Sequence, residues 1–216
     1  MKRYAFLLGI FLFGSLAQAQ ETQKSDEINT VFGKGKDVKV GWVISGQSGY
    51  TQFDKKDVWL GGITAGMVIN HNFTIGLSGN GWGNNNRLYF PDVTDTAGAY
   101  LEGGYGGLLL EYTLFPQSAV HVTFPVLIGG GGASYMTDKD YYDWEDDEWD
   151  TECQSLDHDA YFVIEPGVRA EINILKFMRL DAGVGYHYVA GLDMMNTSSN
   201  MMNNFTVNVG LKFGKF

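Results

Sequence analysis

The sequence predicts an all-β protein, an eight-stranded antiparallel up-and-down transmembrane β-barrel with short periplasmic turns and long extracellular loops. Three observations carry this prediction. Segments in which apolar and polar residues alternate recur along the chain, and the connections between them are alternately short and long. In addition, 29 of the 216 residues are glycine, nearly twice the usual share of about 7%. This much glycine suits curved β-sheet better than helices.

The N-terminus has the composition of a cleaved signal peptide. Basic residues precede an apolar run over residues 4–13, and an A-x-A cleavage site ends at Ala19. A membrane-spanning helix is the alternative, but the run is shorter than the roughly 18 to 20 apolar residues that a span needs. We therefore expect residues 1–19 to be a cleaved signal peptide, residues 20–36 a periplasmic N-terminal segment, and residues 37–216 an outer-membrane β-barrel.

The first four expected strands differ in the clarity of their pattern. Residues 38–45 alternate apolar and polar side chains, and residues 73–78 do so again. Between them, residues 58–69 are more uniformly apolar and rich in glycine. Residues 100–113 form the fourth strand, whose glycines leave the facing of its side chains open.

The last four expected strands are residues 120–128, 161–172, 180–188 and 205–216. The final one is the clearest, because apolar and polar residues alternate without error from Phe205 to Gly214. A strand divided in this way needs apolar surroundings on one side and polar surroundings on the other.

The connections provide a second signal. Three of them are short, at residues 70–72, 113–119 and 173–177, and four are long and polar, at residues 46–57, 82–97, 134–159 and 190–204. Outer-membrane barrels have short turns at one rim and long loops at the other. A soluble lipocalin-like barrel is the alternative, but it has no need of this asymmetry and turns its apolar face inward.

Two prolines test the barrel prediction. Pro125 and Pro166 lie inside expected strands, where each removes one hydrogen-bond donor from the sheet. We expect a β-bulge at each position. Because the two prolines are nearly symmetrical about the 134–159 connection, we also expect them to lie near one another and to share a single local defect.

The polar faces of the strands would place charged and titratable residues inside a narrow barrel. An eight-stranded barrel is just wide enough for its side chains to fill. The favoured interpretation is a packed polar core in which charges pair, and the alternative is a proton or ion path through a small channel. The residues expected in this lumen network are Lys39, Glu111, His121, Glu165, Arg169, Glu171, Asp181, His187 and Lys212.

The 134–159 connection contains an unusual concentration of acid. Eleven acidic residues stand against the single Lys139, so the net charge of this stretch is −10, equal to the formal charge of the whole chain. Such a block is often only a solvated loop, and it repels nucleic acid. The acidic residues are Asp138, Asp140, Asp143, Glu145, Asp146, Asp147, Glu148, Asp150, Glu152, Asp157 and Asp159.

Carboxylates this dense also suggest a divalent cation site. Hard oxygen ligands suit Ca²⁺, or a bridge through divalent cations to anionic lipopolysaccharide, although no spacing matches an EF-hand. Interleaved tyrosines and tryptophans offer contacts for a protein or glycan partner instead. No cofactor other than Ca²⁺ is expected. The cluster assigned to the cation is Asp138, Asp140, Asp143, Glu145, Asp146, Asp147, Glu148 and Asp150.

Catalysis has weaker support. Ser155, His158 and either Asp157 or Asp159 are the residue types of a hydrolytic triad, but a triad is assembled by geometry and rarely from neighbours in sequence. We therefore expect no enzymatic activity and assign no catalytic residue. A lipid-modifying barrel enzyme is the third alternative, after the small channel.

The signal peptide, the eight alternating strands and the aromatic C-terminus together resemble small outer-membrane barrels of the OmpA-transmembrane-domain and OmpX kind. The resemblance is one of pattern over residues 37–216, and no strict motif carries it. It implies a multi-pass protein of the cell outer membrane. It also implies that Phe216 is part of a signal read by the barrel-assembly machinery.

These observations predict a role rather than a reaction. We expect a monomeric outer-membrane barrel with a structural, adhesive or ligand-binding role, exercised through its extracellular loops and chiefly through residues 134–159. The expected partners are the lipid bilayer, lipopolysaccharide and an unidentified extracellular ligand or protein. Loop sequences follow no general code from which that ligand could be named.

Overall fold

The computed structural model describes residues 38–83, 88–91, 93, 98–143 and 148–216. The expected signal peptide and the segment 20–36 lie outside these residues. No helix in the described part of the chain is both long and apolar enough to cross a membrane.

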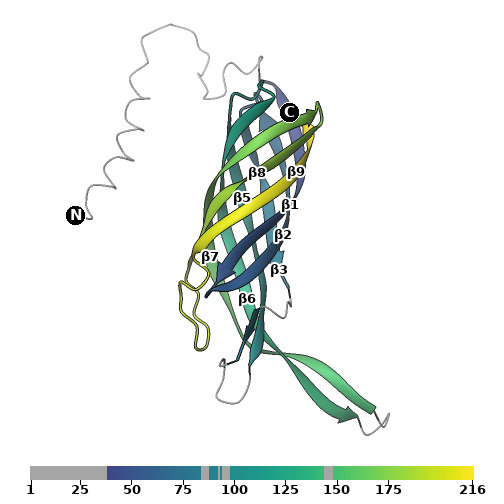
Figure 1. Cartoon of the computed structure of the whole chain (residues 1–216), viewed down its shortest axis with the longest axis vertical. Helices are drawn as coiled ribbons and strands as arrows, with labels where there is room; N and C mark the ends of the chain where they lie inside the picture. The colour runs from purple at the N-terminus through teal and green to yellow at the C-terminus, as the bar shows by residue number, and fades with distance from the viewer. Residues whose placement is uncertain (1–37, 84–87, 92, 94–97, 144–147) are drawn as a thin grey trace, which may run out of the picture. The chain divides into compact units, whose positions relative to one another are not determined.

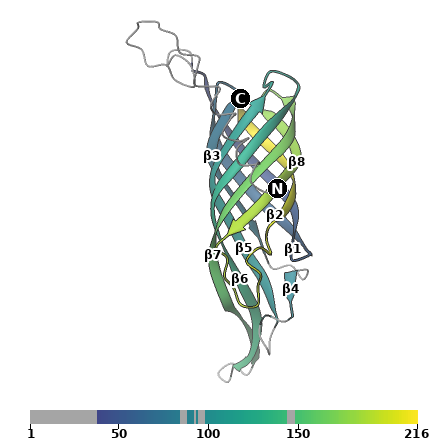
Figure 2. The same cartoon turned by 90° about the vertical axis from the view of Figure 1, so that its left-hand side faces the viewer.

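The described residues form nine antiparallel strands, eight of which close into a barrel (Figure 1). Each barrel strand pairs with its neighbours in the sequence, β1 pairs with β9, and β3 pairs with β5. The additional strand β4 has two residues and pairs with β5 (Figure 2). The strands are β1 (Val40–Phe53), β2 (Lys56–Ile69), β3 (Phe73–Trp82), β4 (Tyr89–Phe90), β5 (Ala99–Leu114), β6 (Val120–Asp143), β7 (Glu148–Leu175), β8 (Met178–Ala190) and β9 (Asn204–Lys215).

The predicted eight-stranded up-and-down barrel is therefore confirmed. The three short connections follow β2, β5 and β7, and they lie at the end of the barrel where β1 begins and β9 ends. We call this the turn end, and the opposite end, where β1 meets β2 and β8 meets β9, the loop end.

One predicted loop is instead a tight hairpin. Residues 46–57 continue β1 and β2, which pair without interruption as far as Phe53 and Lys56. The two residues between them, Asp54 and Lys55, have φ angles of 45° and 65°, as the favoured two-residue hairpin turns require. The prediction was wrong because the polar residues of this stretch concealed the inward-facing side chain of Phe53, which is fully buried.

The acidic 134–159 connection is also mostly strand. β6 and β7 are 24 and 28 residues long, whereas the other barrel strands have 10 to 16. Their pairing continues from Thr137 and Gln154 to Asp143 and Glu148, and it forms a two-stranded ribbon that projects beyond the barrel (Figure 1). We refer to residues 137–143 and 148–154 as the ribbon. Its base is marked by a register shift between Tyr135 and Met136.

The two prolines interrupt the pairing without a bulge. Thr123 pairs with Arg169 and Val126 pairs with Pro166, so the register is the same on both sides of the gap. Pro125 lies opposite Gly167 in this register, and a Cβ atom on Gly167 would contact the Pro125 ring. The expected bulges are therefore absent, but the two prolines do share one local defect.

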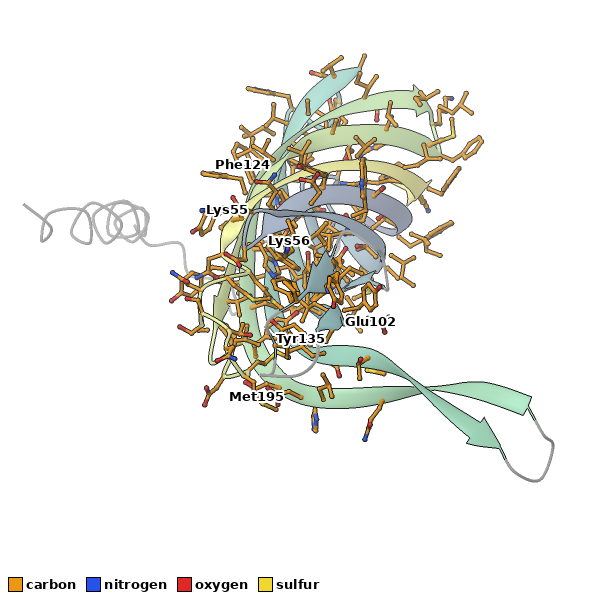
Figure 3. The ribbon with its side chains drawn as sticks, turned by 60° about the horizontal axis from the view of Figure 1, so that its bottom comes forward. Lys55, Lys56, Glu102, Phe124, Tyr135 and Met195 are labelled. Carbon is orange, nitrogen blue, oxygen red and sulfur yellow. The ribbon has the colours of Figure 1, made fainter. Side chains whose placement is uncertain are left out.

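The barrel has an apolar outer wall and a largely polar wall inside its turn-end half. Large apolar side chains project from the outside, including Trp42, Ile63, Leu77 and Phe205, which are 52% to 72% exposed. Figure 3 shows such side chains around the wall, with Phe124 labelled. Polar residues are buried inside at the alternate positions, for example Thr206. This is the distribution that a bilayer outside and a closed interior impose on period-two strands.

The loop-end half of the interior is apolar instead. A cluster of buried side chains fills it, and we call this cluster the plug. The plug consists of Phe53, Val58, Leu60, Trp82, Leu88, Val93, Ala99, Leu101, Tyr105, Leu127, Ala133, Tyr135, Tyr161, Val163, Val189, Leu192, Met194, Met201 and Met202. The expectation of a polar lumen thus holds for only one half of the barrel.

Candidate functional site

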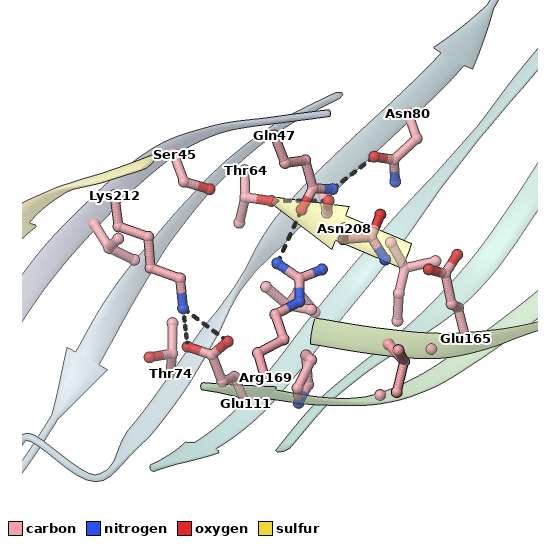
Figure 4. Close-up of a pocket in the computed structure, with 18 residues that line it drawn as sticks. Ser45, Gln47, Thr64, Thr74, Asn80, Glu111, Glu165, Arg169, Asn208 and Lys212 are labelled. Carbon is pink, nitrogen blue, oxygen red and sulfur yellow. Dashed lines mark hydrogen bonds and ion pairs between the residues drawn. The ribbon is translucent and has the colours of Figure 1, made fainter. Parts of the chain in front are cut away.

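Lys212 is the central cation of the turn-end half. Its ammonium nitrogen lies 2.7 and 2.9 Å from the two carboxylate oxygens of Glu111 and 2.7 Å from Oε2 of Glu171. The first of these contacts crosses the lumen from β9 to β5 (Figure 4). All three side chains are buried, so each charge depends on its partners for the stabilisation that water would otherwise supply.

Glu171 has two further partners. Arg179 Nη1 donates a hydrogen bond to Glu171 Oε1 at 2.8 Å, and Nε2 of His121 lies 2.8 Å from the same oxygen. The carboxylate is 1% exposed. One buried acid thus joins three basic side chains from β6, β8 and β9.

A second group lies toward the middle of the barrel. Arg169 Nη1 donates to Asp181 Oδ1 and to Gln47 Oε1, both at 3.1 Å. The amide of Gln47 in turn donates to Asn80 Oδ1 at 2.6 Å (Figure 4). These contacts link four strands across the interior. Asp181 compensates the charge of Arg169, and the Gln47 amide uses both its oxygen and its nitrogen in hydrogen bonds.

Glu165 lies where the polar half meets the plug. Tyr105 donates its hydroxyl hydrogen to Glu165 Oε2 at 2.7 Å, and Thr206 donates to Oε1 at 3.1 Å. Nδ1 of His187 lies 3.1 Å from Glu165 Oε2. The centroid of the His187 ring lies 4.5 Å from the centroid of the Tyr105 ring. This carboxylate therefore has polar partners from three strands, although apolar side chains border it on the loop side.

The structure brings together eight of the nine residues expected in the lumen network. The exception is Lys39, which precedes β1 and is exposed, with its backbone N–H donating to Asn70 Oδ1 at 3.0 Å. The sequence reasoning missed Arg179, because it began the seventh strand one residue later. The alternation itself was sufficient to find it, since Arg179 shares the inward face with Asp181.

Little free space remains inside this half. A cavity of about 30 Å³ lies among these side chains. One water molecule needs roughly 10 to 15 Å³ measured in this way, so the cavity has room for about two. The packed charges and the plug above them leave a closed interior rather than a wide pore.

The loop between β8 and β9, residues 191–203, closes the plug at the loop end, and we call it the cap loop. Its Leu192, Met194, Met201 and Met202 side chains are buried in the plug. The Asn203 side chain also accepts a hydrogen bond from the backbone of Val189 at 2.6 Å.

Two carboxylates on β7 hold the cap loop. Asp159 Oδ2 accepts a hydrogen bond from the Asp193 backbone at 2.6 Å, and Asp157 Oδ2 accepts one from the Met195 backbone at 2.7 Å. Met195 is labelled in Figure 3. Two of the eleven acids of the 134–159 connection are thus structural anchors.

The same residues bear on the triad considered from the sequence. Asp157 and Asp159 direct carboxylate oxygens to the cap loop, while Ser155 Oγ lies 2.8 Å from Ser134 Oγ. His158 is exposed and its backbone N–H donates to Asp157 Oδ1 at 2.8 Å. Among the contacts of the described residues, none joins the side chains of Ser155 and His158.

The side chains of the expected cation cluster lie outside the described part of the structure. Glu145, Asp146 and Asp147 lie outside the described residues, and only the backbone is described for Asp138, Asp140, Asp143, Glu148 and Asp150. Among the side chains that the structure does describe, no group of three His, Cys, Asp or Glu residues is arranged to hold a metal ion. The cation site therefore stays a prediction.

Phe216 lies at the turn end, where its ring contacts Arg179. The Arg179 guanidinium carbon lies 3.6 Å from the centroid of the Phe216 ring, within the range of a cation–π contact. Because Arg179 also binds Glu171, the C-terminal residue is coupled to the buried charges. Its assignment as an assembly signal stays a prediction.

Comparison with known proteins supports the fold alone. No protein-family model matches the chain, and no curated protein does. Among solved structures, Neisserial surface protein A is similar over 83% of this chain and 99% of its own, with 13% identity and a TM-score of 0.56. The attachment invasion locus protein Ail of Yersinia pestis aligns over 81% of this chain and 97% of its own, with 11% identity and a TM-score of 0.42. The strand pairing and the similarity to Neisserial surface protein A together show that the chain has the eight-stranded fold of outer-membrane β-barrels.

Proposed function

We propose that this protein is an integral outer-membrane barrel that displays its β6–β7 ribbon as an adhesive or ligand-binding surface. The observation that carries the proposal is the length of the two strands, 24 and 28 residues. A tilted strand needs only about 9 to 11 residues to cross a bilayer. More than half of each strand is therefore available outside the membrane, where it holds the acidic and aromatic residues of the ribbon.

The outer wall supports the membrane location. Exposed apolar side chains occur on every barrel strand, for example Trp59 at 56%, Met67 at 55% and Val184 at 53%. A soluble protein rarely exposes so large a continuous apolar surface. The lipid bilayer is thus the partner that fits this apolar wall. A monomer is sufficient to form the wall, because the ring of strands is closed and has no free sheet edge.

The interior supports display rather than transport. The polar half consists of paired charges around a cavity of about 30 Å³, and the loop-end half is filled by the plug. Neither half resembles the water-filled lumen of the larger porins. The small-channel alternative therefore receives no support from the geometry.

Membrane location can be tested by fractionation and by SDS-PAGE of heated and unheated samples. We expect recovery with the membranes and a band whose mobility changes on heating. A soluble periplasmic protein without this shift would contradict the barrel assignment and favour a lipocalin-like binding protein.

The role of the ribbon can be tested by adhesion. Cells of a laboratory bacterium lacking adhesins would display either the full chain or a variant in which residues 138–153 are replaced by Asn-Gly. We expect the full chain to increase retention on at least one of laminin, fibronectin and collagen, and the short variant to lose that gain. Equal retention of both variants, with both barrels folded, would contradict the role of the ribbon.

A further inference from the structure

A small pocket opens at the loop end, apart from the ribbon. Its volume is about 230 Å³, and it lies where the β1–β2 turn, β4, β6 and the cap loop meet. Its main lining residues are Asp54, Lys56, Phe90, Val93, Tyr135 and Asn196.

Two aromatic rings form the apolar part of this pocket. Phe90 and Tyr135 meet edge to face, with ring centroids 5.6 Å apart and an interplanar angle of 70°. Tyr135 is 2% exposed, and its hydroxyl lies 2.8 Å from Thr197 Oγ1 in the cap loop. Phe90 is only half-buried. Tyr135 is therefore a fixed support, and Phe90 offers an accessible ring.

Charged groups of both signs border the rings. Lys56 Nζ lies 4.9 Å from the centroid of the Phe90 ring, and both Lys56 and Tyr135 lie at the loop end of the barrel (Figure 3). Asp54 is exposed, and its carboxylate is close enough to contribute to the raised pKa of the Tyr135 hydroxyl, whose main cause is burial. The lining of the pocket thus includes a hydrogen-bond donor, Lys56, and an acceptor, Asp54.

The rim is held in place by backbone contacts. Asp54 has a φ angle of 45°, and its N–H donates to the Met201 carbonyl at 3.0 Å. Asn196 has a φ angle of 47°, and its side-chain amide donates to the Val93 carbonyl at 3.2 Å. Two left-handed turns from distant parts of the chain are therefore fixed against the barrel, so the pocket exists before any ligand binds.

We propose that this pocket binds a single neutral sugar residue of a glycan. A sugar has an apolar face that can stack on Phe90, and each hydroxyl both donates and accepts. Its hydroxyls accept from Lys56 and donate to Asp54, which a purely apolar or purely charged ligand cannot do. Aromatic side chains with a few placed polar groups are the usual lining of small-molecule sites.

Other ligand classes fit less well. A free cation would be repelled by the Lys56 ammonium group, which lines the pocket and lies 4.9 Å from the Phe90 ring centroid. A polyanion would meet Asp54 and the Asp157 carboxylate, which also contributes to the raised pKa of Tyr135. A folded protein partner is too large for a pocket of about 230 Å³. A neutral hydroxyl-bearing ligand satisfies both charges at once.

The test is saturation-transfer NMR on the full chain, folded in a detergent without a sugar headgroup. The probes are glucose, galactose, mannose, fucose, N-acetylglucosamine and N-acetylgalactosamine, each tested separately. We expect at least one to receive saturation from the aromatic protons of the protein. We expect Asp54→Ala to weaken its binding at least about tenfold, the loss that one hydrogen bond to a charged group produces.

Two further variants separate binding from folding. Phe90→Ala should abolish the signal, whereas Tyr89→Ala should keep it, because Tyr89 is the neighbouring residue and its ring instead contacts Tyr100 at 5.1 Å. All variants should remain heat-modifiable. The absence of a signal for every sugar, or an unchanged signal in both Asp54→Ala and Phe90→Ala, would overturn the proposal. Replacing residues 138–153 by Asn-Gly should leave sugar binding intact, so failure of the adhesive role and failure of this site are distinguishable.

Discussion

Lys212 and Glu111 are 101 residues apart in the sequence, and their side chains meet across the lumen through two hydrogen bonds of 2.7 and 2.9 Å. The same ammonium group pairs with Glu171. Removal of one partner from a buried charge cluster costs more than removal of all of them, because the remaining charges lose their compensation. Loss of Lys212 would therefore leave two buried carboxylates with less compensation.

Lys212→Ala should lower the free energy of unfolding by about 3 to 5 kcal/mol, the usual cost of removing one side of a buried ion pair. The measurement is urea unfolding in lipid vesicles, followed by tryptophan fluorescence. Lys215→Ala is the matched control, since Lys215 lies on the same strand but is exposed, and it should change stability by less than about 0.5 kcal/mol. Similar losses in both variants would show that the buried charge network does not contribute more to the free energy of unfolding than an exposed lysine does.

The closed interior predicts the absence of stable conductance. The purified barrel in a planar bilayer should give no reproducible single-channel steps, because paired side chains and the plug occupy the lumen. Regular steps from heat-modifiable protein would contradict this and restore the channel alternative.

The cap loop should be released when its two anchors are neutralised. In Asp157→Asn/Asp159→Asn the charge-assisted bonds to the backbone N–H groups of Asp193 and Met195 weaken, so hydrogen exchange of residues 191–203 should accelerate by at least about tenfold. Asp193→Asn is the control, because only its backbone participates. Unchanged exchange in the double variant would mean that the buried side chains and the other hydrogen bonds of the loop hold it without these two carboxylates.

The contact of Arg179 with Phe216 predicts a role at the turn end. Phe216→Ala removes the ring that the guanidinium contacts at 3.6 Å, and it also removes the expected assembly signal. We expect less heat-modifiable barrel in the membrane fraction. Arg179→Ala tests the contact separately, because it keeps Phe216. Loss of assembly in Phe216→Ala with normal assembly in Arg179→Ala would assign the effect to recognition of the C-terminus rather than to the contact.

The predicted cation cluster has its own test. Calcium added to the full chain should change its tryptophan fluorescence, since Trp144 and Trp149 lie among the acidic residues. Replacement of the eight clustered acids by Asn or Gln should remove the change while the barrel stays folded. An identical response in the neutralised variant, or no response in either protein, would leave the ribbon without a cation site.

The sequence by itself determined the number of barrel strands, their direction and, where the alternation is clear, which residues face the interior. In β9, strict alternation from Phe205 to Gly214 places Lys212 inside and Phe213 outside, and the structure agrees. This prediction is reliable because successive side chains of a strand point to opposite faces. A bilayer outside the barrel then makes that alternation visible as apolar and polar residues.

Only the tertiary structure decided how the inward residues meet. Alternation says that Glu111 and Lys212 both face inward, but their contact depends on the stagger of eight strands around the ring. The tertiary structure also decided that the polar half and the plug occupy different ends of the interior. It likewise decided that β6 and β7 stay paired beyond the barrel. Phe53 was hidden in an expected loop, because a two-residue turn and a long polar loop differ by backbone geometry that local composition does not specify.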